Sequence, residues 1–522
     1  MSAVFSRKAA SVAAFAALLV PRVVRASDAE VTVDAAGQFY DVRSPTGETV
    51  LMRRRVMATL GVGEYNLLSA RPGDAKAGEL NFRARIRYDA DYGIGAAETM
   101  ASQPQSFVPG LAQGAVDLMY GYLEGRRFLG GWLGFRLGRQ YMTDVLGWWS
   151  FDGAEASVTT PYYFRAEVYG GLEQRGGMAI SSPRFEGDGI WRGNRLGYDP
   201  SLYPSFQPVE IAPALGVALE STGVTWIHGR LTYRRVSNTG ASNTSEFASG
   251  LYPSSTVNQW RISSEKIGYA IDASLAKLGG AKGGIVYDLY RSEITSAYAS
   301  LDVYAGQKVT LSADYDYYVP SFDGDSIWNF FAGEPRSDVG LRGNVDVSDR
   351  LSVAANAHAR MFTVQTAPFD PGSGSSYSPS TYCMPNSTPN NCGTVYPSNG
   401  HPFDEGGNLS ARWRTGETRI ALRGSGDFGD EGDRVGADLS GEHIFETRYV
   451  VSGRVGGWQW KDKLRPDRAT TSAQYVLAAG YRFLPRSQGS VEFEHDINGI
   501  VGQRFRLMFV LNIGLGNPGQ LK

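Results

Sequence analysis

Residues that usually carry catalysis or bind metals are scarce in this chain. Its 522 residues include only two cysteines and five histidines. The histidines are His228, His358, His401, His443 and His495. None of them stands in a recognisable Ser-His or Asp-His motif. Asp323-Gly324-Asp325 offers two carboxylates, whereas calcium takes about six to eight oxygen ligands. We therefore predict that the protein is not an enzyme and has no cofactor and no metal site.

Charge excess and long apolar runs are also missing. The 51 Lys and Arg residues nearly balance the 53 Asp and Glu residues, which argues against a nucleic-acid-binding protein, where a basic excess is normal. Beyond the first 26 residues, no apolar run reaches the ~18 residues that a membrane helix needs. No helical periodicity or central linker divides the chain, so one large architecture is expected in place of several soluble domains.

The first 26 residues have the features of a secretory signal peptide. Arg7 and Lys8 form a positively charged start, and an apolar core follows from Ala9 to Val20. Val24-Arg25-Ala26 then provides a small-residue cleavage site. We expect residues 1–26 to be removed and residues 27–522 to form the mature protein.

Alternation between apolar and charged residues is the strongest positive signal, and it is clearest from Leu80 to Asp91. Leu80, Phe82, Ala84, Ile86, Tyr88 and Ala90 occupy one face of an extended strand. Asn81, Arg83, Arg85, Arg87, Asp89 and Asp91 occupy the other, because side chains alternate with period two. A strand of about a dozen residues, apolar on one side and charged on the other, is typical of a tilted membrane-spanning barrel strand.

The same pattern recurs along the chain. About 22 candidate strands follow one another, and we allow roughly 18 to 22, with the segment from Val31 to Val42 either a first strand or a lead-in. Short turns alternate with long connections, the longest at 171–206 and 364–406. Gly279-Gly280 and Gly283-Gly284 mark an expected turn. Propeller blades would show a fixed repeat period, which is absent. The prediction is an all-β fold, a single large transmembrane antiparallel β-barrel with short periplasmic turns and long extracellular loops.

If the apolar residues face lipid, the opposite registers line a hydrated pore. The predicted pore-lining residues are Arg83, Arg85, Arg87, Asp89, Asp91, Asp314, Asp316, Arg342, Arg360, Arg412, Arg414, Arg419, Arg423 and Arg454. Arginines on neighbouring strands would form a positive track for anionic solutes. Alternatively, each arginine pairs with an acid and only holds the shape of the wall. His443 falls on the predicted lipid face.

The two cysteines, Cys383 and Cys392, lie in one segment rich in Ser, Pro and Asn. In an oxidising compartment, this arrangement predicts a disulfide that closes a small loop.

Two short motifs carry a resemblance to a known family. Leu137-Gly138-Arg139-Gln140, followed by Phe151-Asp152-Gly153-Ala154, resembles general and substrate-specific outer-membrane porins, in which a Gly-Arg-Gln strand end often precedes an Asp-Gly step. The segment from Arg504 to Leu515 resembles the closing strand that the barrel-assembly machinery reads. It lacks the usual terminal aromatic residue, since Gly516 to Lys522 follow it. More faintly, the single arginine-rich barrel is similar to outer-membrane barrels of polysaccharide export systems, including the alginate-exporter type.

These resemblances imply a channel in the outer membrane of a Gram-negative bacterium. The expected function is a conduit for export of an acidic polysaccharide, in which the barrel contacts outer-membrane lipid and a periplasmic polysaccharide-export protein. The alternative is a general or anion-preferring diffusion porin for small hydrophilic solutes. A barrel enzyme or an adhesin is a remote alternative, and no nucleic-acid partner is expected.

Overall fold

A computed structural model describes most of the chain. The described residues are 29–68, 77–91, 115–174, 212–238, 260–319, 335–362, 380–383, 392–395, 403–430, 432–463 and 469–516. The expected signal peptide and Asp323-Gly324-Asp325 lie outside these ranges. Among the residues described, no helix is long and apolar enough to cross a membrane.

The described chain is almost entirely strand. The first half contains β1 (Ala29–Arg43), β2 (Thr49–Glu64), β3 (Glu79–Asp91), β4 (Ala115–Arg127), the helical turn α3 (Phe128–Gly131), β5 (Leu133–Asp144), β6 (Gly147–Thr159), β7 (Phe164–Glu173), β8 (Pro213–Ser221), β9 (Ile227–Asn238), β10 (Arg261–Leu275) and β11 (Gly279–Asp288). The second half contains β12 (Glu293–Tyr304), β13 (Val309–Tyr318), β14 (Arg336–Asp346), β15 (Leu351–Phe362), β16 (Ser380–Cys383), β17 (Cys392–Val395), β18 (Phe403–Thr415), β19 (Thr418–Gly429), β20 (Gly432–Phe445), β21 (Tyr449–Asp462), β22 (Ala469–Leu484), β23 (Ser487–Asn498) and β24 (Gly502–Gly516).

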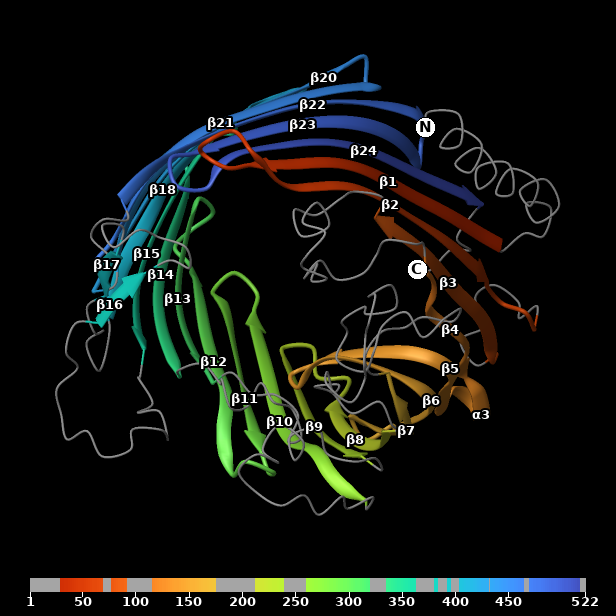
Figure 1. The fold of residues 1–522 in the computed structure, drawn as a ribbon. Coiled ribbons are helices and arrows are strands. Elements are labelled where there is room, and N and C mark those ends of the chain that lie inside the picture. The colour runs from red at the N-terminus through yellow and green to blue at the C-terminus, as the bar shows by residue number, and fades with distance from the viewer. Residues whose placement is uncertain are drawn as a thin grey trace, which may run out of the picture.

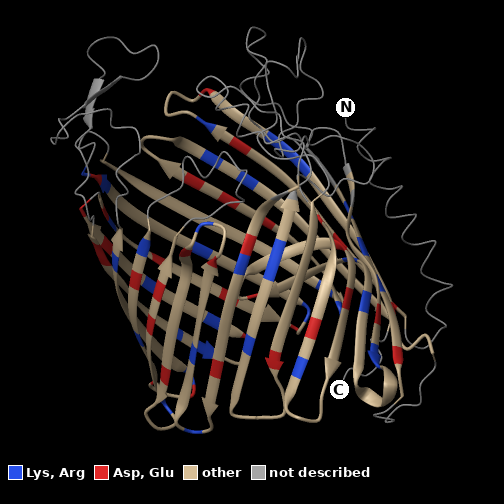
Figure 2. Ribbon diagram, turned by 90° about the horizontal axis from the view of Figure 1, so that it is seen from below, with Lys and Arg blue, Asp and Glu red and all other residues tan. Residues whose placement is uncertain are grey.

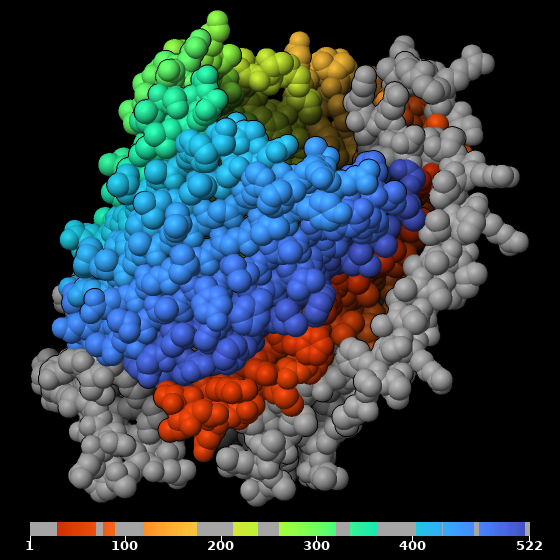
Figure 3. Space-filling model, turned by 90° about the horizontal axis from the view of Figure 1, so that it is seen from above, coloured from red at the N-terminus to blue at the C-terminus, as the bar shows by residue number. Residues whose placement is uncertain are grey.

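Twenty-two of these strands form one closed antiparallel barrel (Figure 1). Each strand pairs with its neighbour in the sequence, and β15 pairs directly with β18. The barrel closes where β1 pairs with β24, from Glu30 opposite Gly516 to Arg43 opposite Gln503. Figure 3 shows the first and last strands lying side by side on the surface. The predicted all-β barrel is confirmed at the upper end of the expected strand number, and Val31 to Val42 lies in β1 as a true strand.

Side chains alternate between the two faces of the wall, as the sequence predicts. In β22, exposed and half-buried residues alternate strictly from Ala469 to Tyr481. One face carries large apolar side chains that remain open to the surroundings, such as Leu341, Leu409 and Leu477, each about 60% exposed. Soluble proteins rarely expose contiguous apolar surface on this scale, whereas a wall against lipid requires it. Charged residues recur along the strands between these apolar positions (Figure 2).

The two ends of the barrel differ. The connections 92–114, 174–212, 239–260, 319–335 and 363–402 all join strands at the same end. The other end carries short turns, including those after β14, β18, β20 and β22, and there the first strand starts and the last strand ends. Figure 2 shows these short turns along the lower rim. We refer to it as the short-turn end.

Three details differ from the expectation. Gly279, Gly280, Gly283 and Gly284 lie inside β11 and not in a turn. The reason is close packing: a Cβ atom at Gly284 would come 2.5 Å from the Tyr298 ring of β12. The 171–206 connection starts later, because β7 runs to Glu173, and the 364–406 connection ends earlier, because β18 starts at Phe403.

Candidate functional site

The hairpin formed by β5 and β6 turns into the barrel. β4 pairs with β5 only from Gly121 to Gly125, whereas β5 pairs with β6 along its whole length. Beyond this point β5 leaves β4 and crosses inside the ring of strands (Figure 1). We call residues 139–151 the inward hairpin. Its turn lies against β10, where a Cβ atom at Gly268 would come 2.6 Å from Val145 and 2.7 Å from Leu146.

This contact identifies the inner face of the wall. Arg234 of β9 donates a hydrogen bond from Nη2 to the Leu146 carbonyl oxygen over 3.2 Å. Arg234 and Gly268 therefore face the interior, and residues two positions away along β9 and β10 share that face because side chains alternate. Directly paired residues lie on the same face of a sheet, so the strand register extends this inner-face assignment to every strand of the barrel.

A small apolar core holds the hairpin against the wall. Trp149 and Phe151 stack with their ring centroids 4.3 Å apart, and the Trp149 ring lies 5.6 Å from that of Tyr169 on β7. Met142, Ala212, Ala214 and Val236 complete this core. The Arg234 guanidinium lies 5.0 Å from the Trp149 ring, a cation–π contact. Since Phe151 is fully buried and Trp149 is 5% exposed, the hairpin is packed and not merely extended into the pore.

Glycines allow the bend at the base of the hairpin. Gly138 of β5 is opposite Gly153 of β6, which is opposite Gly171 of β7. Gly138 has a φ of +125°, which side chains strongly disfavour, and a Cβ atom there would come 2.3 Å from the Gly121 carbonyl oxygen. A Cβ atom at Gly153 would come 2.7 Å from the Gly171 Cα. The three backbones approach closely only because no side chain separates them.

A bidentate ion pair braces the same bend. Arg139 donates from Nε to Asp152 Oδ1 over 2.7 Å and from Nη2 to Oδ2 over 2.8 Å. Its Nη1 also donates to the Leu118 carbonyl oxygen of β4 over 3.1 Å. Gln140 is 1% exposed and donates to the Gly153 carbonyl oxygen. The residues that carry the porin resemblance are thus the residues that form the bend.

The other face of the hairpin is open to the interior. Trp148 is 61% exposed and Tyr141 is 45% exposed. The Tyr141 ring centroid lies 5.8 Å from that of Tyr120 on β4. Beside it, the Arg136 guanidinium lies 6.0 Å from the ring of Tyr122, on the same strand as Tyr120. An aromatic strip therefore borders the interior on this side.

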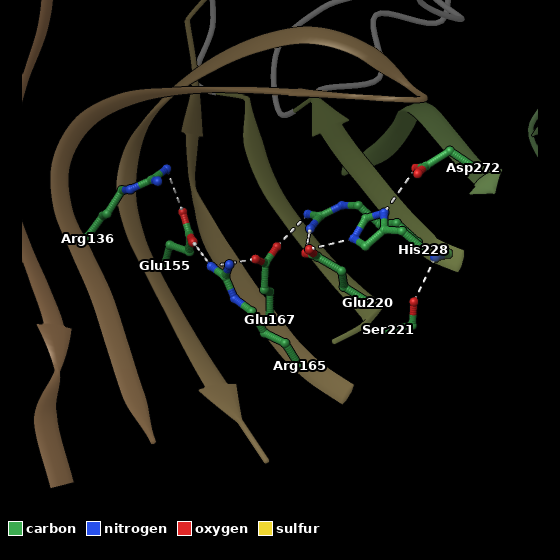
Figure 4. A network of polar contacts seen from close by, with 10 residues as sticks. Arg136, Glu155, Arg165, Glu167, Glu220, Ser221, His228 and Asp272 are labelled. Atoms are coloured by element: carbon green, nitrogen blue, oxygen red, sulfur yellow. Dashed lines mark hydrogen bonds and ion pairs between the residues drawn. The ribbon is translucent and has the colours of Figure 1, made fainter. Parts of the chain in front are cut away.

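A ladder of alternating charges lines the inner wall from β4 to β10, toward the short-turn end, and Figure 4 shows its part from Arg136 to Asp272. The residues of this ladder are Glu124, Arg126, Arg136, Glu155, Arg165, Glu167, Glu220, His228, Arg230 and Asp272. Arg136 of β5 bridges the two strands beside it, with Nε 3.1 Å from Glu124 of β4 and Nη1 3.4 Å from Glu155 of β6.

The middle of the ladder is buried. The Glu167 side chain is 4% exposed and contacts both Arg165, at 2.7 Å, and Arg230. Arg230 also lies 2.7 Å from Glu220. His228 closes the ladder, with Nε2 2.9 Å from Glu220 and Nδ1 3.3 Å from Asp272. Such mutual pairing leaves little free charge on this wall, so its main effect is to hold seven strands in register.

The arginines of β3 are largely engaged with neighbours. Arg85 pairs with Asp34 of β1 and donates to Thr59 of β2. The Arg83 guanidinium lies 5.9 Å from the Tyr65 ring. Arg87 also has an interaction partner. Asp89 and Asp91 continue the strand, with side chains outside the described set. This run fits the wall-pairing alternative that the sequence left open.

The remaining predicted pore residues lie on the opposite wall, from β13 to β21 (Figure 1). Four of them are near acids: Arg342 4.0 Å from Asp314, Arg360 2.9 Å from Asp338, Arg419 3.4 Å from Glu442 and Arg454 3.1 Å from Asp438. Arg412, Arg414 and Arg423 are exposed and form no ion pair within the described chain, and Asp316 is exposed on the same face. The two arginine groups therefore stand on different walls and form no continuous track.

None of the ladder residues was among the pore-lining residues predicted from the sequence. The available signal was a charged residue at an inner-face position in each of seven successive strands. That signal becomes readable only when the strand register is known.

The cysteines fall directly opposite each other in the small β16–β17 hairpin, Cys383 with Cys392. Cα atoms of directly opposed antiparallel residues are about 4.5–5.5 Å apart, which is within disulfide range. The disulfide itself stays a prediction.

Comparison with known proteins finds likeness in structure alone. No protein-family model and no curated protein matches the sequence. The chain is similar to OccAB4 of Acinetobacter baumannii, with 7% identity, a TM-score of 0.40, and coverage of 94% of this chain and 98% of that one. It is similar to the outer-membrane protein OpdK of Pseudomonas aeruginosa, with 10% identity, a TM-score of 0.39, and coverage of 94% and 98%. OmpT of Vibrio cholerae is 7% identical, with a TM-score of 0.33 and coverage of 68% and 99%. At these values the likeness carries no conclusion about substrate.

Proposed function

We propose that the protein is a water-filled diffusion channel of the bacterial outer membrane for small hydrophilic solutes, with a preference for anions. The observation that carries this proposal is the inward hairpin inside a closed barrel whose outer face is apolar. A hairpin held by a buried core narrows the passage along one side. A charged inner wall keeps the remaining passage hydrated, since charged groups are costly to remove from water.

The same architecture supports a location in the outer membrane. Closed barrels leave no unpaired strand edge and can therefore cross a bilayer without a membrane helix. The short-turn end would then face the periplasm and the long connections the exterior. In this proposal the channel has no chemistry of its own, and its partners are lipid and the permeating solutes.

Polysaccharide export is less well supported as the function. The expected arginine track for an acidic polymer is interrupted, because the β3 arginines and the β18–β19 arginines lie on different walls. The packed hairpin also stands in the way of a long chain. No comparison adds support for the exporter reading or for a periplasmic export partner.

Two measurements test the proposal. The purified protein in a planar bilayer should give a stable ionic conductance that favours chloride over potassium in a salt gradient. Proteoliposomes should swell in small sugars and stop swelling as the sugar grows, because the hairpin sets a size limit. Absence of conductance would refute the proposed channel function. Free passage of long glycan chains would favour polysaccharide export instead.

A further inference from the structure

A hollow of about 730 Å³ lies on the inner wall near the short-turn end, across β15 and β18 to β22. Five arginines line it: Arg350, Arg412, Arg414, Arg419 and Arg454. Three acids share the lining: Asp346, Asp349 and Glu442. The hollow is thus the place on this wall where positive charge gathers with the least compensation.

The strand register shows how the hollow is built. One row of paired inner-face residues reads Ser352, Arg412, Ala421, Ser440 and Arg454 across five neighbouring strands. The small side chains of Ala421 and Ser440 form the floor between two arginines. With strands about 4.8 Å apart, Arg412 and Arg454 are separated by about 14 Å along the wall. Long guanidinium side chains can therefore converge on a ligand seated between them.

The next row toward the short turns places like charges together. Arg414 of β18 is directly opposite Arg419 of β19. Like charges in direct cross-strand pairs destabilise a sheet. Arg419 has Glu442 at 3.4 Å, whereas Arg414 forms no ion pair within the described chain. Arg412, two residues from Arg414 on the same face, also has none.

The charged ladder on the other wall provides a contrast. Every arginine of that ladder forms an ion pair with a carboxylate. Here Arg350, Arg412 and Arg414 border an open space without ion partners among the residues described. Guanidinium groups bind carboxylates through two parallel hydrogen bonds, which makes them suited to an anion that carries two such groups.

We propose that this hollow is a binding site for small organic dianions, specifically dicarboxylates, at the periplasmic exit of the channel. One carboxylate is held by Arg412 and Arg414. The other faces Arg454 across the small-residue floor; the Arg454 Nε donates to Asp438 over 3.1 Å, which leaves its Nη groups for the ligand. The role of this site in transport rests on the proposed channel function. Binding itself does not, because it can be measured without any ionic current.

Direct binding provides the first test. Succinate titrated calorimetrically into the detergent-solubilised protein should bind at least about tenfold more tightly than acetate, because two charge-assisted contacts replace one. The Arg412→Gln/Arg414→Gln variant should lose about tenfold in succinate affinity. The matched control is Arg342→Gln/Arg434→Gln, which removes the same charge from exposed inner-face positions outside the hollow. If both variants lose succinate affinity equally, the effect comes from the overall charge of the pore and the proposed site is wrong.

Channel block provides the second test. In a planar bilayer, succinate should reduce chloride current more strongly when added on the short-turn side, because it reaches the hollow there without passing the hairpin. The Arg412→Gln/Arg414→Gln variant should abolish this asymmetry, and the control variant should keep it. If the protein binds succinate but does not conduct ions, the proposed channel function is wrong and the binding site stands. If it conducts ions but does not prefer succinate to acetate, the binding site is wrong and the channel function stands.

Discussion

Replacing Trp149 by alanine should release the inward hairpin and widen the channel. Trp149 is 5% exposed, stacks on Phe151 at 4.3 Å and lies under the Arg234 guanidinium at 5.0 Å. Truncating a buried tryptophan to alanine costs about 3–5 kcal/mol. Because every 1.4 kcal/mol is about a factor of ten, the ratio of docked to released hairpin should fall by roughly two to four orders of magnitude.

The barrel itself should survive this change. The backbone pairing of β7 to β9 and the β1–β24 closure do not depend on the Trp149 side chain, so the variant should still show heat-modifiable migration in detergent. The single-channel conductance should rise, the current should become noisier, and larger sugars should enter proteoliposomes. Trp148→Ala is the matched control, because its side chain is 61% exposed on the opposite face of the same strand. It should raise conductance less than Trp149→Ala does, because the hairpin stays docked and only one side chain is removed from the passage.

A crosslink can restore the docked state in the same variant. A Cβ atom at Gly268 of β10 would come 2.6 Å from Val145 Cγ1, so Val145→Cys with Gly268→Cys should form a disulfide that ties the turn to the wall. Oxidation should return the Trp149→Ala variant to the conductance of the unmodified protein, and reduction should reverse this. If Trp149→Ala folds and conducts like the unmodified protein, the hairpin does not set the width of the passage.

Three further predictions concern other parts of the wall. Glu167→Gln leaves two partly buried arginines without a full counter-charge and should destabilise the barrel by about 1–3 kcal/mol, measured as a lower temperature of heat modification. Cys383 and Cys392 should be disulfide-bonded, and replacing both should leave the barrel folded; free thiols by mass spectrometry in the non-reduced protein would contradict this. Phe82→Arg with Ile86→Arg should impair insertion into lipid vesicles, since each charge facing lipid costs roughly 2–4 kcal/mol near the midplane, and normal insertion would contradict the assigned facing.

The predictions that depended only on the alternation of residues within a strand are confirmed for the fold. Alternation in Leu80 to Asp91 identified a wall strand, and the recurrence of that pattern identified a barrel with about 22 strands. The Gly138-Arg139-Gln140 motif was read only as a resemblance to porins. In the structure it marks the bend of β5, where Gly138 supplies the φ of +125° and Arg139 braces Asp152.

The arginines show where local pattern stops being sufficient. Arg85 and Arg412 occupy equivalent positions in an alternating strand, and nothing in their immediate sequence separates them. Arg85 meets Asp34, which is 51 residues earlier in the chain, whereas Arg412 faces the small side chains of Ser352 and Ala421. Only the pairing register decides which arginine is neutralised and which stays available to a solute.

The sequence by itself determined the class of fold and the face on which each strand residue lies. Those properties follow from a period of two, which is encoded within a few residues. The tertiary structure decided the inward hairpin, the charged ladder and the dianion hollow. Each of these requires residues distant in sequence to meet, as Leu146 meets Gly268 and Arg234 covers Trp149. Such contacts depend on the register of the strands and on the bend at Gly138, and neither is specified by alternation.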